Sequence, residues 1–391
     1  MTDIPIAAAG STAIEAPSTA RLAFIDNIRW SMIILVLSMH ACDTYSPFGN
    51  WYYVDRQPSD LPTKLFFGVY QSFLQAFFMA LLFFIAGYFS AASYDRKGFA
   101  PFVRDRVLRL GVPTLLYMAV IGPLTQYFLS HTWGRGGFGH QWLTHLKDGE
   151  WLSETGPMWF CAALLALSVL YGLCRLAGLK EPSFEPRDGR GGGAIAGFIA
   201  VMAVATFLVR IVVTEDASVL NMHPGDFPQY VLMYAAGALG YRGNWLLRLS
   251  DSSCLRWAAL ALSLSAILFA TLIVFGGALQ GDTSSYAGGF NPVSGGKCLW
   301  EALVCVGMGL LLLERYRRHF DRQGPFARWL SDNAFGVYLI HPPILVGAAI
   351  LLHGVVLPAI AKAALLTAIA AVGSFAASAF ILRKSPLRAI L

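Results

Sequence analysis

Charged residues are scarce in this chain. They make up 13% of its 391 residues, whereas hydrophobic residues make up 56%. A soluble domain usually carries about 25% charged residues, so the composition excludes an ordinary soluble protein. No polar stretch is long enough for a separate soluble domain, and at roughly 20 residues per spanning helix the chain has room for about ten. We therefore expect an all-α, polytopic helical bundle in a lipid bilayer.

A signal peptide and a metal-type cysteine pattern are also missing. The first twenty residues are rich in Ala, Ser and Thr but lack a basic n-region, so we expect residues 1–22 to be a disordered cytoplasmic tail. One transmembrane domain should then span 23–385. The six cysteines show no CxxC or zinc spacing, which argues against metal or redox chemistry. Cys298 and Cys305 lie seven residues apart and are expected to be free, buried thiols.

The apolar runs predict ten helices, and the connections between them differ in charge. Most of the 29 Lys and Arg residues fall at the termini and on alternate connections. By the positive-inside rule, both termini then lie in the cytoplasm, and the net charge of +6 needs no nucleic acid to explain it. The predicted helices are 24–44, 65–92, 107–130, 157–178, 194–213, 227–243, 257–279, 297–315, 331–352 and 357–382. The outer connections and adjoining helix ends hold only Arg56, Lys64, Arg135, Lys147, Arg210 and Lys297.

Two ionisable residues interrupt the first apolar run. Arg29 and His40 are eleven residues apart, so on a helix they share one face, about 16 Å apart along the axis. Ionisable groups at membrane depth are costly and usually face a cavity or a partner. Asp43 is three residues beyond His40, where it can hold the imidazole in one tautomer. This pattern predicts a cation near the cytoplasmic side and a proton acceptor deeper in the membrane; the alternative is a structural histidine bonded to a backbone carbonyl.

A basic cluster follows the second helix, in FVRDRVLRLGVP at 102–113. Arg106 and Arg109 are three residues apart, with Arg104 nearby, and guanidinium groups on one face suit a phosphate clamp. Tyr88 follows Gly87 at the inner end of the second helix, where a glycine permits close helix approach beside a donor channel. A phosphorylated donor with a long arm, such as coenzyme A, fits this arrangement. The alternative is positive-inside charge that binds anionic lipid headgroups.

Other candidates lie toward the outer side. His341 is in SDNAFGVYLIHPP (331–343), where Pro342 and Pro343 free backbone carbonyls, and it suits acceptor or acyl binding as well as packing. The outer connections 45–64 and 131–156 are rich in Trp, Tyr, Gly and His, which is typical of a sugar site and equally of an interfacial aromatic belt. Further candidates for acceptor contact, each with a structural alternative, are Trp159, Glu154 and Glu301.

With these motifs in this order along the chain, the sequence resembles the acyltransferase-3 family of integral membrane acyltransferases, including its glucan-succinylating branch. One position departs from the family pattern: many members have a basic residue where this chain has Asp105, although Arg104 can substitute for it. The stretches that carry the resemblance are DNIRWSMIILVLSMH (26–40), FFIAGYFS (83–90), RVLRLGVP (106–113), GPMWF (156–160) and GVYLIHPP (336–343).

The resemblance implies a multi-pass enzyme of the cytoplasmic membrane that moves an acyl group, such as acetyl or succinyl, from cytoplasmic acyl-CoA to a carbohydrate hydroxyl. His40 matches the family's catalytic histidine and Arg29 the arginine of the same motif. Arg106 and Arg109 match the arginines assigned to donor binding. No metal is implied. The competing hypothesis is a proton-coupled secondary transporter in which His40 and His341 relay protons.

Overall fold

The computed structural model describes residues 22–130, 137–152, 154–179, 181, 191–248 and 251–380. In these ranges the chain is helical, apart from short connections and an isolated bridge between Val219 and Met222. Apart from Leu22, the tail predicted over 1–22 lies outside the described residues, as does the domain boundary at 385. All six cysteines are free, and Cys298 and Cys305 are buried, as expected.

Every predicted helix is present. The long ones are α1 (Ala23–Tyr45), α2 (Leu61–Lys97), α7 (Trp159–Leu176), α8 (Gly191–Val212), α9 (Phe227–Arg242), α11 (Asp251–Phe275), α12 (Pro292–His319), α13 (Pro325–Leu351) and α14 (Ala359–Phe380). The third predicted helix is a continuous run of α3 (Phe99–Arg106), α4 (Val112–Leu116) and α5 (Gly122–Ser130), joined by π-helical turns at Val107–Gly111 and Tyr117–Ile121. Shorter helices are α6 (Gly137–Lys147) and α10 (Trp245–Arg248).

The connection predicted at 93–106 is wrong. α2 continues to Lys97 and α3 begins at Phe99, so Gly98 alone separates them, with a φ of 72° that favours glycine. Arg and Lys are good helix formers, so the charges that mark the edge of the lipid do not end the helix. The basic cluster therefore lies on a helix rather than in a loop.

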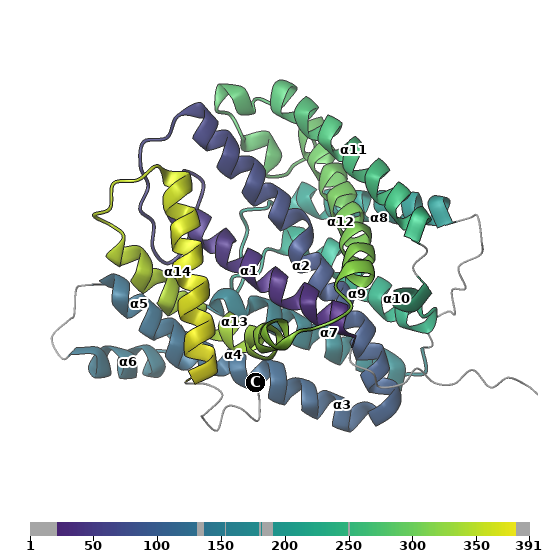
Figure 1. The fold of residues 1–391 in the computed structure, drawn as a ribbon, viewed down its shortest axis with the longest axis horizontal. Coiled ribbons are helices and arrows are strands. Elements are labelled where there is room, and N and C mark those ends of the chain that lie inside the picture. Colours follow the sequence, from purple (N-terminus) through teal and green to yellow (C-terminus); the bar gives the residue numbers. More distant parts are fainter. Residues whose placement is uncertain are drawn as a thin grey trace, which may run out of the picture.

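Eight of these helices are long and apolar enough to cross a membrane. α9 is not among them because it has 16 residues, and α1 is not because polar residues such as Arg29 and His40 lower its mean hydropathy. α1 instead runs through the middle of the bundle, in contact with α2, α12, α13 and α14 (Figure 1). This central position lets its polar side chains face protein rather than lipid.

The outer connection between α1 and α2 is anchored by a buried ion pair. Lys362 of α14 is fully buried, and its Nζ lies 2.8 Å from Oδ2 of Asp55. The Asp55 backbone N–H donates to the carbonyl of Thr44 at 2.8 Å, and Arg56 donates to the carbonyl of Gly49 at 2.6 Å. The segment that follows α1 is thereby held close to the end of that helix.

Two glycines set the contact between α2 and α9. A Cβ added at Gly87 would lie 2.0 Å from the carbonyl oxygen of Tyr234, and one added at Gly237 would lie 1.9 Å from that of Phe84. Real Cβ atoms do not approach backbone oxygens so closely, so the backbones touch only because both positions are glycine. The close approach predicted at Gly87 is confirmed.

We predict that Gly87→Ala lowers the free energy of unfolding by about 1–3 kcal/mol, because α2 and α9 must separate to admit the methyl group. Gly68→Ala is the matched control on the same helix, since its Cβ would meet only Phe48 at an ordinary 3.6 Å. The thermal unfolding midpoint in detergent measures both variants. Equal midpoints would contradict a glycine-dependent contact.

Candidate active site

His40 is held by Asp43 on the same helix. The His40 Nδ1 lies 3.3 Å from Asp43 Oδ2, and Gln71 of α2 donates from Nε2 to Asp43 Oδ1 at 2.7 Å. A carboxylate only accepts hydrogen bonds, so a neutral His40 carries its proton on Nδ1 and presents the lone pair of Nε2. The contact expected from the i, i+3 spacing is present. Gln71 was missed, because a contact between distant segments leaves no local pattern.

The imidazole of His40 lies in an aromatic stack. Trp51, from the connection anchored by Lys362, is parallel to it within 9° at a centroid distance of 4.3 Å. His341 of α13 lies at 5.4 Å from His40, tilted by 15°. α1, the connection that follows it and the distant helix α13 thus meet at one ring. The sequence indicated an aromatic outer connection but did not single out Trp51.

Pro342 explains the orientation of His341. A proline has no N–H, so the carbonyl of Tyr338, four residues earlier, loses its helical partner. The Nδ1 of His341 takes that place at 2.8 Å from the Tyr338 oxygen. Because a carbonyl only accepts, Nδ1 carries the proton and Nε2 is left as an acceptor. The His341 side chain is fully buried, and its Nε2 has no hydrogen-bond partner among the described residues.

Arg29 and Arg106, which the charge pattern predicts on the cytoplasmic side, both contact the FFIAGYFS segment of α2. Arg29 lies over the ring of Phe89 at 5.0 Å, and Arg106 donates to the hydroxyl of Ser90 at 3.3 Å. Consecutive residues of α2 therefore contact both guanidinium groups, and Arg106 lies within electrostatic range of both Arg29 and Arg109. These three cations come from two separate helical segments and form a positive cluster that suits a polyphosphate.

Several side chains of the positive cluster are accessible to solvent. The Arg29 side chain is 44% exposed and pairs with Asp26 at 3.4 Å, while Arg104 and Arg109 are exposed. Asp105, the departure from the family pattern, forms an ion pair with Lys97 instead of with Arg106. Its carboxylate is therefore engaged at the end of α2.

Arg109 lies in the first π-helical turn, and a proline accounts for that turn. Pro113 removes the N–H that would bond the Arg109 carbonyl, and the Val112 N–H instead donates to the carbonyl of Val107, five residues earlier. The widened turn places Arg109 on the exposed side of the helix while Leu110 is buried.

Tyr88 packs inside the bundle. Its side chain is buried, and its ring lies edge-on to Tyr241 of α9 at 5.4 Å. This packing adds to the glycine contact between α2 and α9. A role for Tyr88 in donor binding stays a prediction.

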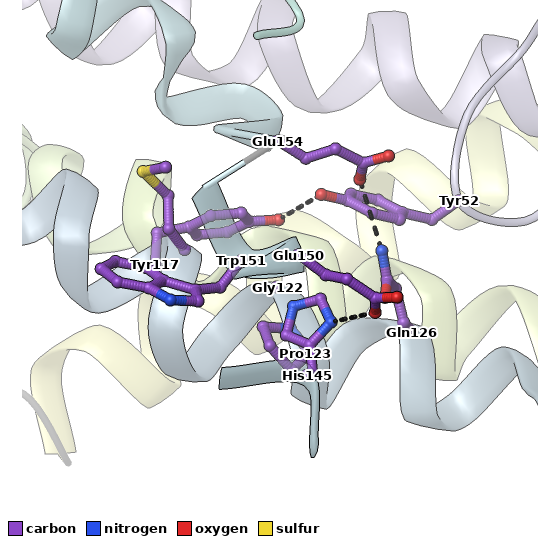
Figure 2. A pocket seen from close by; sticks show the side chains of 10 residues that line it. Tyr52, Tyr117, Gly122, Pro123, Gln126, His145, Glu150, Trp151 and Glu154 are labelled. Carbon is purple, nitrogen blue, oxygen red and sulfur yellow. Dashed lines mark hydrogen bonds and ion pairs between the residues drawn. The ribbon is translucent and has the colours of Figure 1, made fainter. Parts of the chain in front are cut away.

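A cavity of about 300 Å³ is lined by Tyr52, whose ring lies 5.2 Å from that of Trp51 in the stack. Figure 2 shows the side chains around this cavity. Glu154 lines it and accepts from Gln126 at 3.3 Å, and the hydroxyl of Tyr117 donates to that of Tyr52 at 3.0 Å. The other lining residues are Met118, Gly122, Pro123, His145, Glu150 and Trp151.

A second freed carbonyl supports one wall of this cavity. Pro123 leaves the carbonyl of Ala119 without its helical partner, and the indole of Trp142 on α6 donates to that oxygen at 2.7 Å. α6 is thus bound to the second π-helical turn. It carries His145 to the cavity, where Nδ1 lies 3.1 Å from Glu150 Oε2.

Glu301 and Trp159 belong to a separate group. Glu301 is buried with its Oε2 2.8 Å from NH1 of Arg210, whose NH2 lies 2.6 Å from Asp226. The ring of Trp159 packs on that of Tyr230 at 5.6 Å. This arrangement neutralises the Arg210 cation, and it does not bring Glu301 or Trp159 into the stack around His40. The Arg210 cluster was not predicted as a unit; the signal was an arginine at the end of a strongly apolar helix.

A family comparison agrees with the sequence motifs. The acyltransferase-3 family model, described as an acyltransferase domain, matches residues 22–383. The chain belongs to the acyltransferase-3 family. It is therefore a multi-pass membrane protein with a domain that transfers acyl groups. Searches of the curated proteins and of the solved structures gave no match.

We predict that Asp43→Asn lowers kcat for acyl transfer by roughly two orders of magnitude or more. With Gln71 still donating to Oδ1, the asparagine directs its NH₂ group at His40 and places the imidazole proton on Nε2. Adding Gln71→Leu lets the amide flip and should restore part of the rate.

Asp60→Asn is the control for loss of one carboxylate. Asp60 caps α2 by accepting from the Thr63 N–H at 3.0 Å, and asparagine caps equally well. If Asp43→Asn turned over as fast as this control, orientation of the His40 imidazole by Asp43 would not matter for transfer.

Proposed function

We propose that this acyltransferase moves an acyl group from acyl-CoA to a hydroxyl of a carbohydrate, with His40 as the general base. The observation that carries the proposal is the contact between His40 Nδ1 and Asp43, because it directs the basic Nε2 away from the carboxylate. Family membership favours acyl transfer over the proton-coupled transport that His40 and His341 would otherwise suit.

The donor is proposed to bind at the positive cluster of Arg29, Arg106 and Arg109, with Arg104 at its edge. Phosphates of the nucleotide meet the guanidinium groups, and the thioester arm extends toward His40, about 16 Å further along α1 by helix geometry. The positive-inside pattern favours the cytoplasmic side of the cytoplasmic membrane for this cluster, which is where acyl-CoA would be available.

In the proposed reaction, the acceptor O–H gives its proton to His40 Nε2 as its oxygen attacks the thioester carbonyl. The C–S bond breaks, and the proton passes to the departing sulfur, which leaves as CoA thiol. A two-step route through acyl-His40 uses the same nitrogen. No metal enters either route. The acceptor lies toward the outer side, near His341 and Glu154; Trp159 and Glu301 remain more distant candidates.

We expect two variants to show opposite defects. His40→Ala should bind acyl-CoA normally but lose transfer, because the arginine cluster is intact and the base is gone. Arg106→Ala should raise the KM for acyl-CoA by about tenfold or more, because a charge-assisted contact to phosphate is lost. Transfer assays and acyl-CoA binding to purified protein measure both effects.

The donor substrate supplies the control for Arg106→Ala. An acyl-pantetheine lacks the nucleotide phosphates, so its KM should be unchanged in this variant. Arg256→Ala on α11 serves as the matched arginine control, because Arg256 bonds Ser253 of its own helix. Normal turnover in His40→Ala would refute the base assignment, and an equal loss with both donors would refute phosphate binding by Arg106.

A further inference from the structure

The cavity beside Trp51 is built from both outer connections. Tyr52 comes from the connection after α1, and His145, Glu150, Trp151 and Glu154 come from α6 and the segment after it. These side chains line one hollow (Figure 2). At about 300 Å³, the cavity lies at the lower end of the range for small-molecule sites, about 300–1,000 Å³.

The cavity adjoins the proposed base. Tyr52 follows Trp51, and their rings lie 5.2 Å apart, while Trp51 stacks on His40 at 4.3 Å. A single aromatic ring therefore separates the cavity wall from the imidazole. A molecule held in the cavity has to extend past the wall at Tyr52 and past Trp51 to bring a hydroxyl to His40.

The wall between cavity and base depends on Gly156. It has a φ of 53°, and a Cβ there would lie 2.5 Å from both the Tyr52 hydroxyl and the Tyr117 ring. Burial and, to a lesser extent, the negative charge of Glu154 raise the pKa of the Tyr52 phenol to about 12, although the hydrogen bond from Tyr117 lowers it. Tyr52 therefore keeps its proton at neutral pH and offers a neutral donor at the wall.

The lining of the cavity combines hydrogen-bonding side chains with an aromatic face. Glu150 and Glu154 accept strong hydrogen bonds from neutral hydroxyls, and Gln126 can both donate and accept. Trp151 offers an aromatic face for the C–H face of a ring. Among the described residues that line the cavity there are two carboxylates and no Lys or Arg. An anionic group would be repelled there, whereas an uncharged, hydroxyl-rich ring would be bound.

We propose that this cavity binds one uncharged sugar ring of the acceptor, with its hydroxyls bonded to Glu150 and Glu154 and its face on Trp151. A hydroxyl of the same glycan then reaches His40 past Tyr52 and Trp51. This inference rests on the proposed function and names the class of acceptor: neutral glycans rather than those with carboxylate or phosphate groups on the bound ring.

The test uses purified full-length protein, radiolabelled acyl-CoAs, and neutral hexose oligosaccharides with their uronic-acid counterparts as acceptors. The variants are Glu154→Gln and Trp151→Ala. We expect the KM for a neutral acceptor to rise about tenfold or more in each, since a charge-assisted hydrogen bond or a ring contact is lost. The KM for acyl-CoA should stay unchanged, and the uronic-acid counterpart should be a poor acceptor for the unmodified protein.

Asp148→Asn is the matched control, because Asp148 is an exposed carboxylate of the same segment that does not line the cavity. If the two cavity variants matched this control in acceptor KM, or if uronic acids were acylated as well as neutral sugars, the acceptor site would be overturned. If no glycan of either kind were acylated by the unmodified protein, the proposed function itself would fail. The two failures are therefore distinguishable.

Discussion

The cost of polar groups at membrane depth constrains this structure most strongly, and α1 shows how that cost is offset. Neighbouring segments of the bundle supply hydrogen-bond partners for the polar side chains of α1. Asn27 donates to the carbonyl of Phe320 at 2.7 Å, Ser31 accepts from Tyr316 at 2.8 Å, and Ser38 bonds Tyr70 at 2.8 Å. A helix with this many polar side chains can hold a cation near one end and a base near the other because its neighbours supply their partners.

Prolines extend the same principle to the backbone. Pro342 and Pro123 each free one helix carbonyl, and a nearby side chain bonds to it: His341 at Tyr338 and Trp142 at Ala119. These hydrogen bonds satisfy the freed carbonyls and also fix the orientation of the side chains that donate to them. His341 acquires a defined tautomer beside His40, and α6 is held against the cavity. In the HPP sequence, the orientation of His341 therefore depends on Pro342.

Much of the fold was predictable because apolar runs, helix period and charge asymmetry are local signals. The Arg29 and His40 spacing and the His40–Asp43 contact follow from the geometry of one helix. Gln71 and Trp51 were not predictable, because their positions depend on how α2 and the outer connection pack on α1. The connection at 93–106 was wrong because a change from apolar to basic residues marks the lipid boundary and not a helix end.

The central claim is that α1 holds donor phosphates at Arg29 and the thioester at His40 in one continuous site. The most direct measurement is a cryo-EM map of the protein in lipid nanodiscs with a non-reactive thioether analogue of acyl-CoA. The account predicts phosphate density against Arg29, Arg106 and Arg109, and the sulfur beside His40 Nε2. Phosphate density on another flank of the bundle, or close-packed side chains between Arg29 and His40, would contradict it.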